Sequence, residues 1–257
     1  MPTSTQALGR LYLVPAPLDF MCETQVPLTQ VMPLHTLQIA SELSHWVCEN
    51  AKSTRALLKR IDAVCPLKTP LQSQHLVELP RLVHKKGDHA AGVDTSGLLA
   101  NALAGHDMGL VSEAGMPAVA DPGSSLVRAA HDAGVEVIPL VGPSSLLLAL
   151  SASGLNGQQF AFVGYLPQDA SERAQRIQAL EKQALKTGET QICIETPYRN
   201  QALWQALLGH LQANTRLCRS SNLSLPEMQN VSKRVADWRK APGELDKHTP
   251  VVFAFGP

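Results

Sequence analysis

The sequence lacks an excess of charge of either sign. Lysine and arginine together number 22, and aspartate and glutamate also number 22. A nucleic-acid-binding protein often carries a bulk positive charge that neutralises phosphates, and this composition weakens an RNA-binding interpretation without excluding it. Three basic clusters remain, each more typical of a solvated surface than of a phosphate track: Arg55/Lys59/Arg60, Arg81/Lys85/Lys86 and Lys233/Arg234/Arg239/Lys240.

Paired metal-binding or redox cysteines are also missing. The five cysteines are odd in number and widely spaced, and none forms a C-x-x-C pair. The nine histidines are scattered singly, which gives no metal-ligand pattern. The cysteines predict reduced, mostly buried thiols, as expected of a cytoplasmic protein. The scattered histidines predict no bound metal.

No uninterrupted apolar run is long enough for a membrane span. The most apolar stretch, 135–152, is broken by Pro139, Gly142 and Pro143, which predicts a strand, a turn and a helix instead. Residues 1–9 lack the basic, apolar and small-residue regions of a signal peptide. We therefore expect a disordered leader at 1–9 and a protein that is not secreted.

Several common catalytic motifs are absent as well. The segment after the first predicted strand reads Val14-Pro15-Ala16-Pro17-Leu18-Asp19, so it carries no G-x-G-x-x-G, and no phosphate-binding G-x-x-x-x-G-K-[ST] occurs. Neither H-E-x-x-H nor G-x-S-x-G is present. An ordinary dinucleotide-binding fold, a P-loop protein, a zinc protease and a serine hydrolase are all disfavoured.

Short apolar strands alternate with segments of helical period. This alternation predicts an α/β protein, and the strand number predicts two sheets in two domains, 1–142 and 143–257, joined at Val141-Gly142-Pro143. The predicted strands are 11–14, 46–48, 109–111, 135–138, 160–163, 191–194 and 251–255. The predicted helices are 28–43, 53–61, 96–104, 124–133, 144–153, 171–186 and 199–212.

Four polar segments each follow a predicted strand and precede a helix. They are 49–55, 111–124, 139–146 and 195–199. The carboxyl ends of strands in an open α/β sheet are where ligands usually bind, and Gly115 and Gly123 would let the backbone approach a ligand closely. Ser144 and Ser145 could present hydroxyls and N–H groups at a helix start. Each segment alone also suits a purely structural connection.

Together, these segments resemble the tetrapyrrole methylase superfamily, and within it the branch of ribosomal RNA small-subunit methyltransferase I. The resemblance covers nearly the whole chain and is highly specific as an ordered series. It rests on the opening strand through Pro17, on 49–55, on the run Ser112 to Gly123, which is similar to S-D-A-G-T-P-x-x-x-D-P-G, and on 139–145, 149–155 and 163–167.

The resemblance implies a two-domain methyltransferase, usually a homodimer, that binds S-adenosylmethionine in a cleft between its α/β domains and needs no metal. Glu49 or Glu195 would be the general base for a ribose hydroxyl. The implied donor contacts are Pro15, Glu113, Gly115, Pro117, Ser144, Ser145, Ile194, Cys218, Thr249 and Pro250.

The chain also departs from the branch. Leu18-Asp19 stands where the branch has G-N, Glu113 replaces an aspartate, Glu49-Asn50 replaces E-D with an insertion before Thr54, and Arg219 to Leu223 lacks the acid and lysine of R-E-L-T-K. The acceptor therefore stays open at this point. The main hypothesis is 2′-O-methylation of a ribosomal RNA cytidine, which a basic rim around Arg55, Lys85 and Arg199 would favour. The alternatives are a tetrapyrrole or other small acceptor, and a catalytically silent module that binds the donor.

Overall fold

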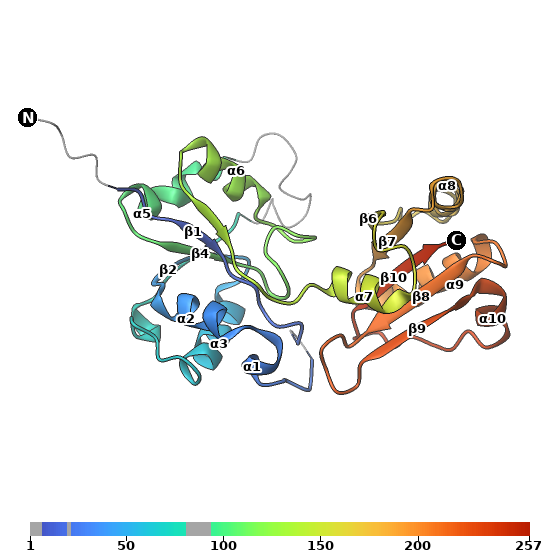
Figure 1. Ribbon diagram of the computed structural model, residues 1–257, viewed down its shortest axis with the longest axis horizontal. Coiled ribbons are helices and arrows are strands. Elements are labelled where there is room, and N and C mark those ends of the chain that lie inside the picture. The colour runs from blue at the N-terminus through green and yellow to red at the C-terminus, as the bar shows by residue number, and fades with distance from the viewer. Residues whose placement is uncertain (1–6, 20–21, 81–93) are drawn as a thin grey trace, which may run out of the picture. The chain divides into compact units, whose positions relative to one another are not determined.

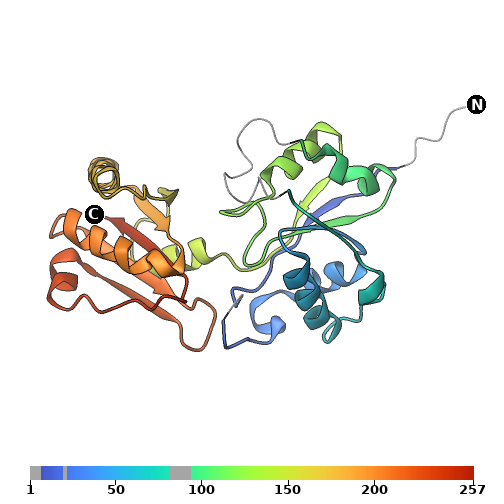
Figure 2. The same cartoon turned by 180° about the vertical axis from the view of Figure 1, so that it is seen from behind.

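The chain folds into two units, each containing its own β-sheet. The structure is a computed structural model, and it describes residues 7–19, 22–80 and 94–257. The units are Met1–Pro143 and Ser144–Pro257 (Figures 1 and 2). Helices and strands alternate along both, so the predicted α/β class is confirmed.

The first unit is built on a parallel sheet. Its strands are β1 (Leu11–Leu13), β2 (His45–Cys48), β3 (His75–Glu78), β4 (Met108–Val111) and β5 (Val137–Pro139), in the order β3-β2-β4-β1-β5. All four neighbouring pairs are parallel. A parallel sheet is normally buried on both faces, and the three central strands β2, β4 and β1 are accordingly largely apolar and buried, whereas the edge strand β3 is mostly exposed.

Helices cover both faces of this sheet. Helices α1 (Leu28–Val31), α2 (Leu34–Glu42) and α3 (Ala51–Asp62) pack against one face, and η2 (Ser96–Leu99), α5 (Ala100–Leu103) and α6 (Ser124–Asp132) pack against the other (Figure 1). A short turn, η1 (Leu71–Ser73), precedes β3. The predicted helix 28–43 is two helices, because Pro33 lies between them and disfavours a helical conformation for the residue before it.

The second unit is built on a mixed sheet. Its strands are β6 (Phe160–Tyr165), β7 (Thr190–Ile194), β8 (Arg216–Ser221), β9 (Gln229–Arg234) and β10 (Val251–Gly256), in the order β6-β7-β10-β8-β9. The β6–β7 pair is parallel and the other three pairs are antiparallel. Strands β3, β8 and β9 and helix α10 were not predicted, because their sequences are short or largely polar.

An aromatic cluster fixes the helices on the second sheet. Helices α8 (Ala170–Thr187), α9 (Asn200–His210) and α10 (Val235–Lys240) share one core with the sheet, and η3 (Pro197–Arg199) leads into α9. In this core the rings of Trp204 and Trp238 meet edge to face, with 4.9 Å between centroids. Helix α7 (Ser145–Ser153) packs against β8, β9 and β10.

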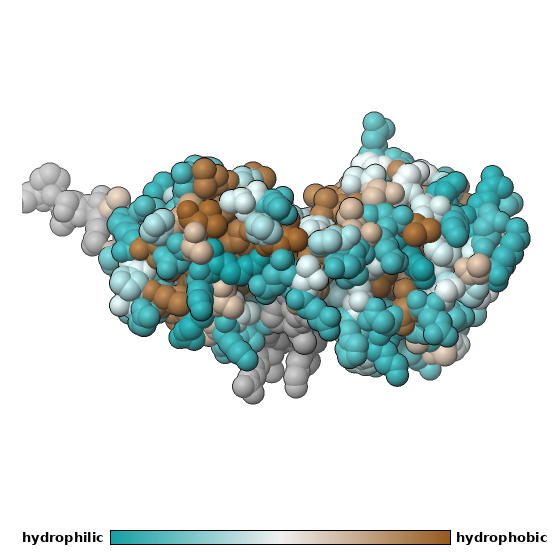
Figure 3. All heavy atoms as spheres, turned by 90° about the horizontal axis from the view of Figure 1, so that it is seen from below, coloured by the Kyte–Doolittle hydropathy of each residue, from teal (hydrophilic) through white to brown (hydrophobic). Residues whose placement is uncertain are grey.

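The surface mixes polar and apolar residues, as the balanced composition leads one to expect. On the face seen in Figure 3, apolar residues lie in small groups among polar ones in each unit. Within the part of the chain that the structure describes, every helix is too short or too polar to span a lipid bilayer.

Candidate functional site

Three connections of the first unit meet at one edge of its sheet. Residue Leu13 of β1 lies opposite Leu110 of β4 and Pro139 of β5. Because all three strands are parallel, the segments that follow them, 15–18, 112–123 and 140–143, leave the sheet side by side. This is the carboxyl edge, where ligands bind in open α/β sheets.

The backbone of these segments is closely packed. Ala16 N donates to Gly115 O at 2.9 Å, and Gly115 N donates to Ala16 O at 3.0 Å. A Cβ atom added at Gly142 would lie 2.3 Å from Cβ of Pro15, so only glycine fits there. Gly115 has φ of +73°, a conformation that glycine adopts readily. Pro15, Ala16, Gly115 and Gly142 thus form a cradle made mainly of backbone, which we call the glycine cradle.

The connection after β4 also holds strained backbone. Ala118 and Ala120 both have φ of 63°, in the left-handed region that alanine rarely occupies. Ala118 N is held by a hydrogen bond to Pro122 O at 3.3 Å. Pro117, a predicted donor contact, lies directly before this strained stretch. Such strain persists only where the surrounding structure enforces it, and it is concentrated at functional sites.

Three carboxylates gather beside the cradle. Glu49 follows β2, and its Oε2 accepts a hydrogen bond from Glu113 N at 3.2 Å. The backbone of Glu49 is held by Val111 O, which accepts from Glu49 N at 3.2 Å. Burial, with the nearby charges of Glu49 and Glu113, raises the pKa of Asp121 to about 7. This corner therefore favours a cationic ligand.

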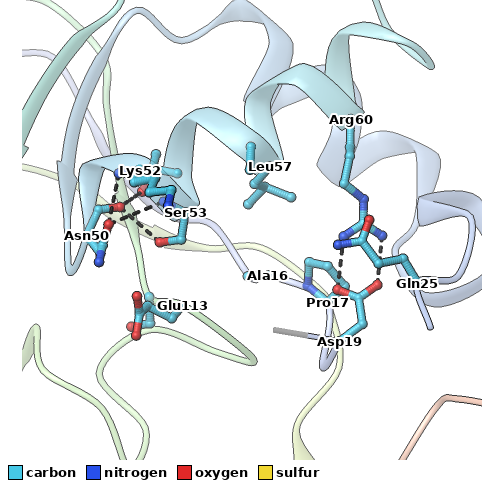
Figure 4. Close-up of a pocket in the computed structure, with 13 residues that line it drawn as sticks. Ala16, Pro17, Asp19, Gln25, Asn50, Lys52, Ser53, Leu57, Arg60 and Glu113 are labelled. Atoms are coloured by element: carbon cyan, nitrogen blue, oxygen red, sulfur yellow. Dashed lines mark hydrogen bonds and ion pairs between the residues drawn. The ribbon is translucent and has the colours of Figure 1, made fainter. Parts of the chain in front are cut away.

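A pocket of about 430 Å³ adjoins the carboxylates (Figure 4). Its wall is formed by Ala16, Pro17, Asp19 and Gln25 together with residues of 50–60 and 112–113, all in the first unit. The N-cap residue Asn50 accepts hydrogen bonds from Lys52 N at 2.9 Å and Ser53 N at 3.3 Å through its Oδ1. Across the pocket, Arg60 forms an ion pair with the buried Asp19 at 2.8 Å.

The other predicted residues lie in the second unit. Ser144 is the N-cap of α7 and Ser145 its first residue, and no side-chain hydrogen bond from Ser144 caps the helix. Ile194 ends β7 opposite Val252, and Thr249-Pro250 immediately precede β10. These two segments therefore lie at the same end of neighbouring strands. Thr249 is held there because its carbonyl accepts from Asn200 Nδ2 at 3.0 Å.

The side chains of Cys218 and Glu195 are both enclosed. Cys218 lies within β8 opposite Ala254, and burial raises the pKa of its thiol. The Glu195 carboxylate forms an ion pair with Arg199 at 2.8 Å and also accepts from Thr196 N, and its side chain is 4% exposed. The Glu195 carboxylate is therefore already engaged by a guanidinium and a backbone N–H.

The comparison with known families decides the assignment. Residues 40–236 match the family described as Tetrapyrrole (Corrin/Porphyrin) Methylases. The chain belongs to the tetrapyrrole methylase family. The ribosomal RNA small subunit methyltransferase I of Halalkalibacterium halodurans is 33% identical over 191 residues, 74% of this chain and 56% of that protein. Its Escherichia coli O157:H7 counterpart is 31% identical over 173 residues, 67% of this chain and 52% of that protein. The chain thus spans about half the length of the curated relatives it matches.

Solved structures with the same fold cover nearly the whole chain. Uroporphyrin-III-C-methyltransferase from Thermus thermophilus has a TM-score of 0.53 and 21% identity, covering 96% of this chain and 94% of that chain. The methyltransferase CobJ has a TM-score of 0.55 and 15% identity with the same coverage. At these identities the likeness shows the fold. The family match and the curated relatives confirm the resemblance inferred from the motifs.

The structure groups the predicted site residues by unit. Pro15, Glu49, Glu113, Gly115 and Pro117 lie on the connections at the carboxyl edge of the first sheet. Of the basic rim, Arg55 is exposed on α3 and Arg199 is paired with Glu195, while Lys85 lies outside the described residues, as does all of the cluster 81–86.

Sequence reasoning missed four residues that shape this candidate site. Asp19, Arg60, Ser112 and Asp121 gain their significance from burial or from a distant partner. Ser112 and Asp121 do lie in the segments that the motif singled out, and Asp19 lies two residues beyond the first of them. The pairing of Asp19 with Arg60, 41 positions apart, had no sequence signal.

Proposed function

We propose that this chain is an S-adenosylmethionine-dependent methyltransferase that 2′-O-methylates a cytidine of small-subunit ribosomal RNA. The glycine cradle at the carboxyl edge of the first sheet is the observation that carries the proposal, since it offers close backbone access for a cofactor. Family membership and the names of the relatives support the reaction and the acceptor class.

The residues present suit this methyl donor. A Cβ atom at Gly142 would clash with Pro15, so this position requires glycine. Because glycine has no side chain, its backbone stays open to a ligand at this edge. The carboxylates of Glu49, Glu113 and Asp121 favour the positive charges of the donor's sulfonium and ammonium groups. In this proposal Pro15, Glu113, Gly115 and Pro117 contact the donor from the first unit. Its contacts from the second unit are Ser144, Ser145, Ile194, Cys218, Thr249 and Pro250.

The protein's chemical task is alignment and proton removal. The bound sulfonium supplies an electrophilic methyl group, so no nucleophilic side chain is required. The chain must hold the acceptor oxygen in line with that methyl group and exclude water. The 2′-hydroxyl must lose its proton, and we assign this role to Glu49, because Glu195 is already neutralised by Arg199.

Substituting Glu49 separates proton removal from donor binding. We expect Glu49→Gln to lower the rate of methyl transfer about 100-fold or more, the usual contribution of a general base. Donor affinity, measured by isothermal titration, should change by less than about tenfold, since the amide retains the shape of the carboxylate. The comparison variant Glu195→Gln should reduce stability more than turnover. Unchanged turnover in Glu49→Gln would remove Glu49 from the mechanism.

The acceptor is tested by radiolabelled methyl transfer. Purified protein and labelled donor are incubated with small ribosomal subunits that lack methylation, and in parallel with uroporphyrinogen III. The proposal predicts label in ribosomal RNA that survives alkaline hydrolysis as a 2′-O-methylated dinucleotide. Label in the tetrapyrrole alone would replace the RNA assignment, and donor binding without label in either acceptor would indicate the silent module.

The oligomeric state and the compartment belong to the same proposal. We expect a homodimer acting in the cytoplasm, where ribosomal subunits are available. Sedimentation equilibrium tests the first point, because a homodimer gives twice the mass of the 27.7 kDa chain.

A further inference from the structure

The pocket beside Asn50 lies where the strand order of the first sheet changes direction, between β2 and β4. The connection leaving β2 runs to β3 on one side, whereas the connection leaving β4 crosses β1 to reach β5 on the other. Neighbouring strands whose connections diverge leave a crevice at their carboxyl ends, which is the standard ligand position of open α/β sheets. Asn50 follows β2 and Ser112 follows β4, so both lie at this crevice.

Ser112 supplies a polar atom that requires a partner. It lines the pocket, and the residue is 5% exposed. Its Oγ is buried and has no hydrogen-bond partner among the residues that the structure describes. A buried hydroxyl without a partner is costly, and native proteins leave few of them. This hydroxyl therefore lies on a pocket wall, where a bound ligand would supply the missing partner.

The charges of the pocket wall balance. Lys52 and Arg60 are cationic, Asp19 and Glu113 are anionic, and Arg60 is already paired with Asp19. A macrocycle carrying several carboxylates would need several unpaired cations, and the described residues of this wall do not offer them. The balance favours a neutral, polar ligand.

The remaining wall combines amides with apolar surface. Asn50 uses Oδ1 to cap α3, which leaves its Nδ2 group available to donate. In Figure 4 the side chain of Leu57 and the segment Ala16-Pro17 flank the space between Asn50 and the Asp19–Arg60 pair. Polar groups beside apolar walls are the features that read a base taken out of its stack. The volume of about 430 Å³ is typical of small-ligand pockets, roughly 300–1,000 Å³.

We propose that this pocket holds a neutral nucleoside of the RNA acceptor, with Ser112 Oγ hydrogen-bonded to the edge of its base. The inference rests on the proposed RNA methyltransferase function and adds where the acceptor is recognised. Ser112 is then a specificity-determining residue, and the Asp19–Arg60 pair closes the far wall.

Ligand binding in the pocket can be measured without methyl transfer. Saturation-transfer difference NMR is recorded on the full-length protein, without donor, with adenosine, cytidine, guanosine and uridine as probes, and separately with uroporphyrin III. Three variants are compared: Ser112→Ala removes the hydroxyl, Ala56→Phe fills the pocket from an exposed lining position, and Lys59→Phe places the same ring at an exposed position on α3 outside the pocket.

The proposal predicts that cytidine, the nucleoside methylated in the proposed function, binds the wild type. Ser112→Ala should weaken this binding about three- to tenfold, the effect of one hydrogen bond. Ala56→Phe should weaken it at least tenfold, and Lys59→Phe should leave it unchanged. Equal nucleoside binding in the wild type, Ser112→Ala and Ala56→Phe would overturn the proposal, as would binding of uroporphyrin III in preference to every nucleoside.

The two proposals fail in different ways. A wild type that methylates ribosomal RNA but gives no nucleoside signal contradicts the pocket and leaves the enzyme assignment intact. A wild type that binds nucleosides with the predicted variant effects, yet transfers no methyl group to RNA, contradicts the enzyme assignment and supports the pocket.

Discussion

Asp19 is a buried carboxylate whose charge is balanced by one guanidinium. Its Oδ1 accepts from Arg60 Nη1 at 2.9 Å and its Oδ2 from Arg60 Nη2 at 2.8 Å, while Nη2 also reaches Val26 O. The pair joins the connection after β1 to α3. A buried pair is costly to break on one side, because the remaining charge loses its partner but stays away from water.

Removing only the arginine should therefore destabilise the first unit. We expect Arg60→Met to lower its free energy of unfolding by roughly 3–5 kcal/mol. The double variant Asp19→Asn/Arg60→Met should recover much of this loss, since no buried charge remains. Urea unfolding followed by tryptophan fluorescence measures the change, with Trp46 contributing the signal of the first unit and Trp204 and Trp238 that of the second. A single variant as stable as the wild type would contradict this role.

Asp121 makes the stability of the first unit depend on pH. Its pKa of about 7 in the folded state is above the ordinary value of 3.8. The folded state therefore holds this proton more tightly than the unfolded state. The stabilisation is fully present below pH 3.8 and is lost as pH rises to about 7, with an upper limit of about 4 kcal/mol.

Replacing the acid by an amide should remove this pH dependence. We expect Asp121→Asn to gain stability relative to the wild type at pH 8 and to gain little at pH 4. Urea midpoints measured across this range test the prediction, and Asp132→Asn on the exposed end of α6 is the matched control. If the difference in stability between wild type and Asp121→Asn were the same at every pH, Asp121 would not be the group responsible for the pH dependence.

At the scale of elements, α3 shows how a family motif serves both fold and site. Asn50 replaces an aspartate of the E-D-T-R motif, and both residue types are strong N-caps. The substitution therefore keeps the helix start in place, and with it Glu49 at the end of β2. The departure from the motif removes the charge of the cap, while Asn50 still accepts from Lys52 N and Ser53 N.

The cap can be tested by itself. Asn50→Ala should lower the free energy of unfolding by about 1 kcal/mol, because Lys52 N and Ser53 N lose their acceptor. Asn50→Asp should preserve stability, since its carboxylate accepts the same bonds. Chemical denaturation with the Trp46 signal measures both variants. Equal losses in the two variants would show that the cap is not the source of the effect.

The elements that sequence predicted best are those with a strong apolar period. Strands β1, β2, β4 and β10 are short and almost wholly apolar, and they were located to within one or two residues. Strand β9 reads Gln-Asn-Val-Ser-Lys-Arg, and its extended conformation comes from pairing with β8, which a local pattern does not reveal. The candidate site segments could be singled out because their motif is contiguous, whereas the buried hydroxyl of Ser112, which has no partner among the described residues, depends on tertiary burial.

At the scale of the whole molecule, the chain consists of two α/β units with different sheets. The first sheet is parallel and carries the glycine cradle, the three carboxylates and the pocket. The second is mixed and carries Ile194, Thr249 and Pro250 at neighbouring strand ends. The proposed donor contacts come from both units, so the enzyme assignment depends on the complete chain.

The most direct test of the account is isothermal titration of the full chain with S-adenosylmethionine and with S-adenosylhomocysteine. The account predicts micromolar binding of both ligands at one site per chain. It also predicts that Gly142→Val, which would place a side chain against Pro15, abolishes binding while the chain remains folded. If neither ligand binds the folded wild type, the methyltransferase assignment is contradicted.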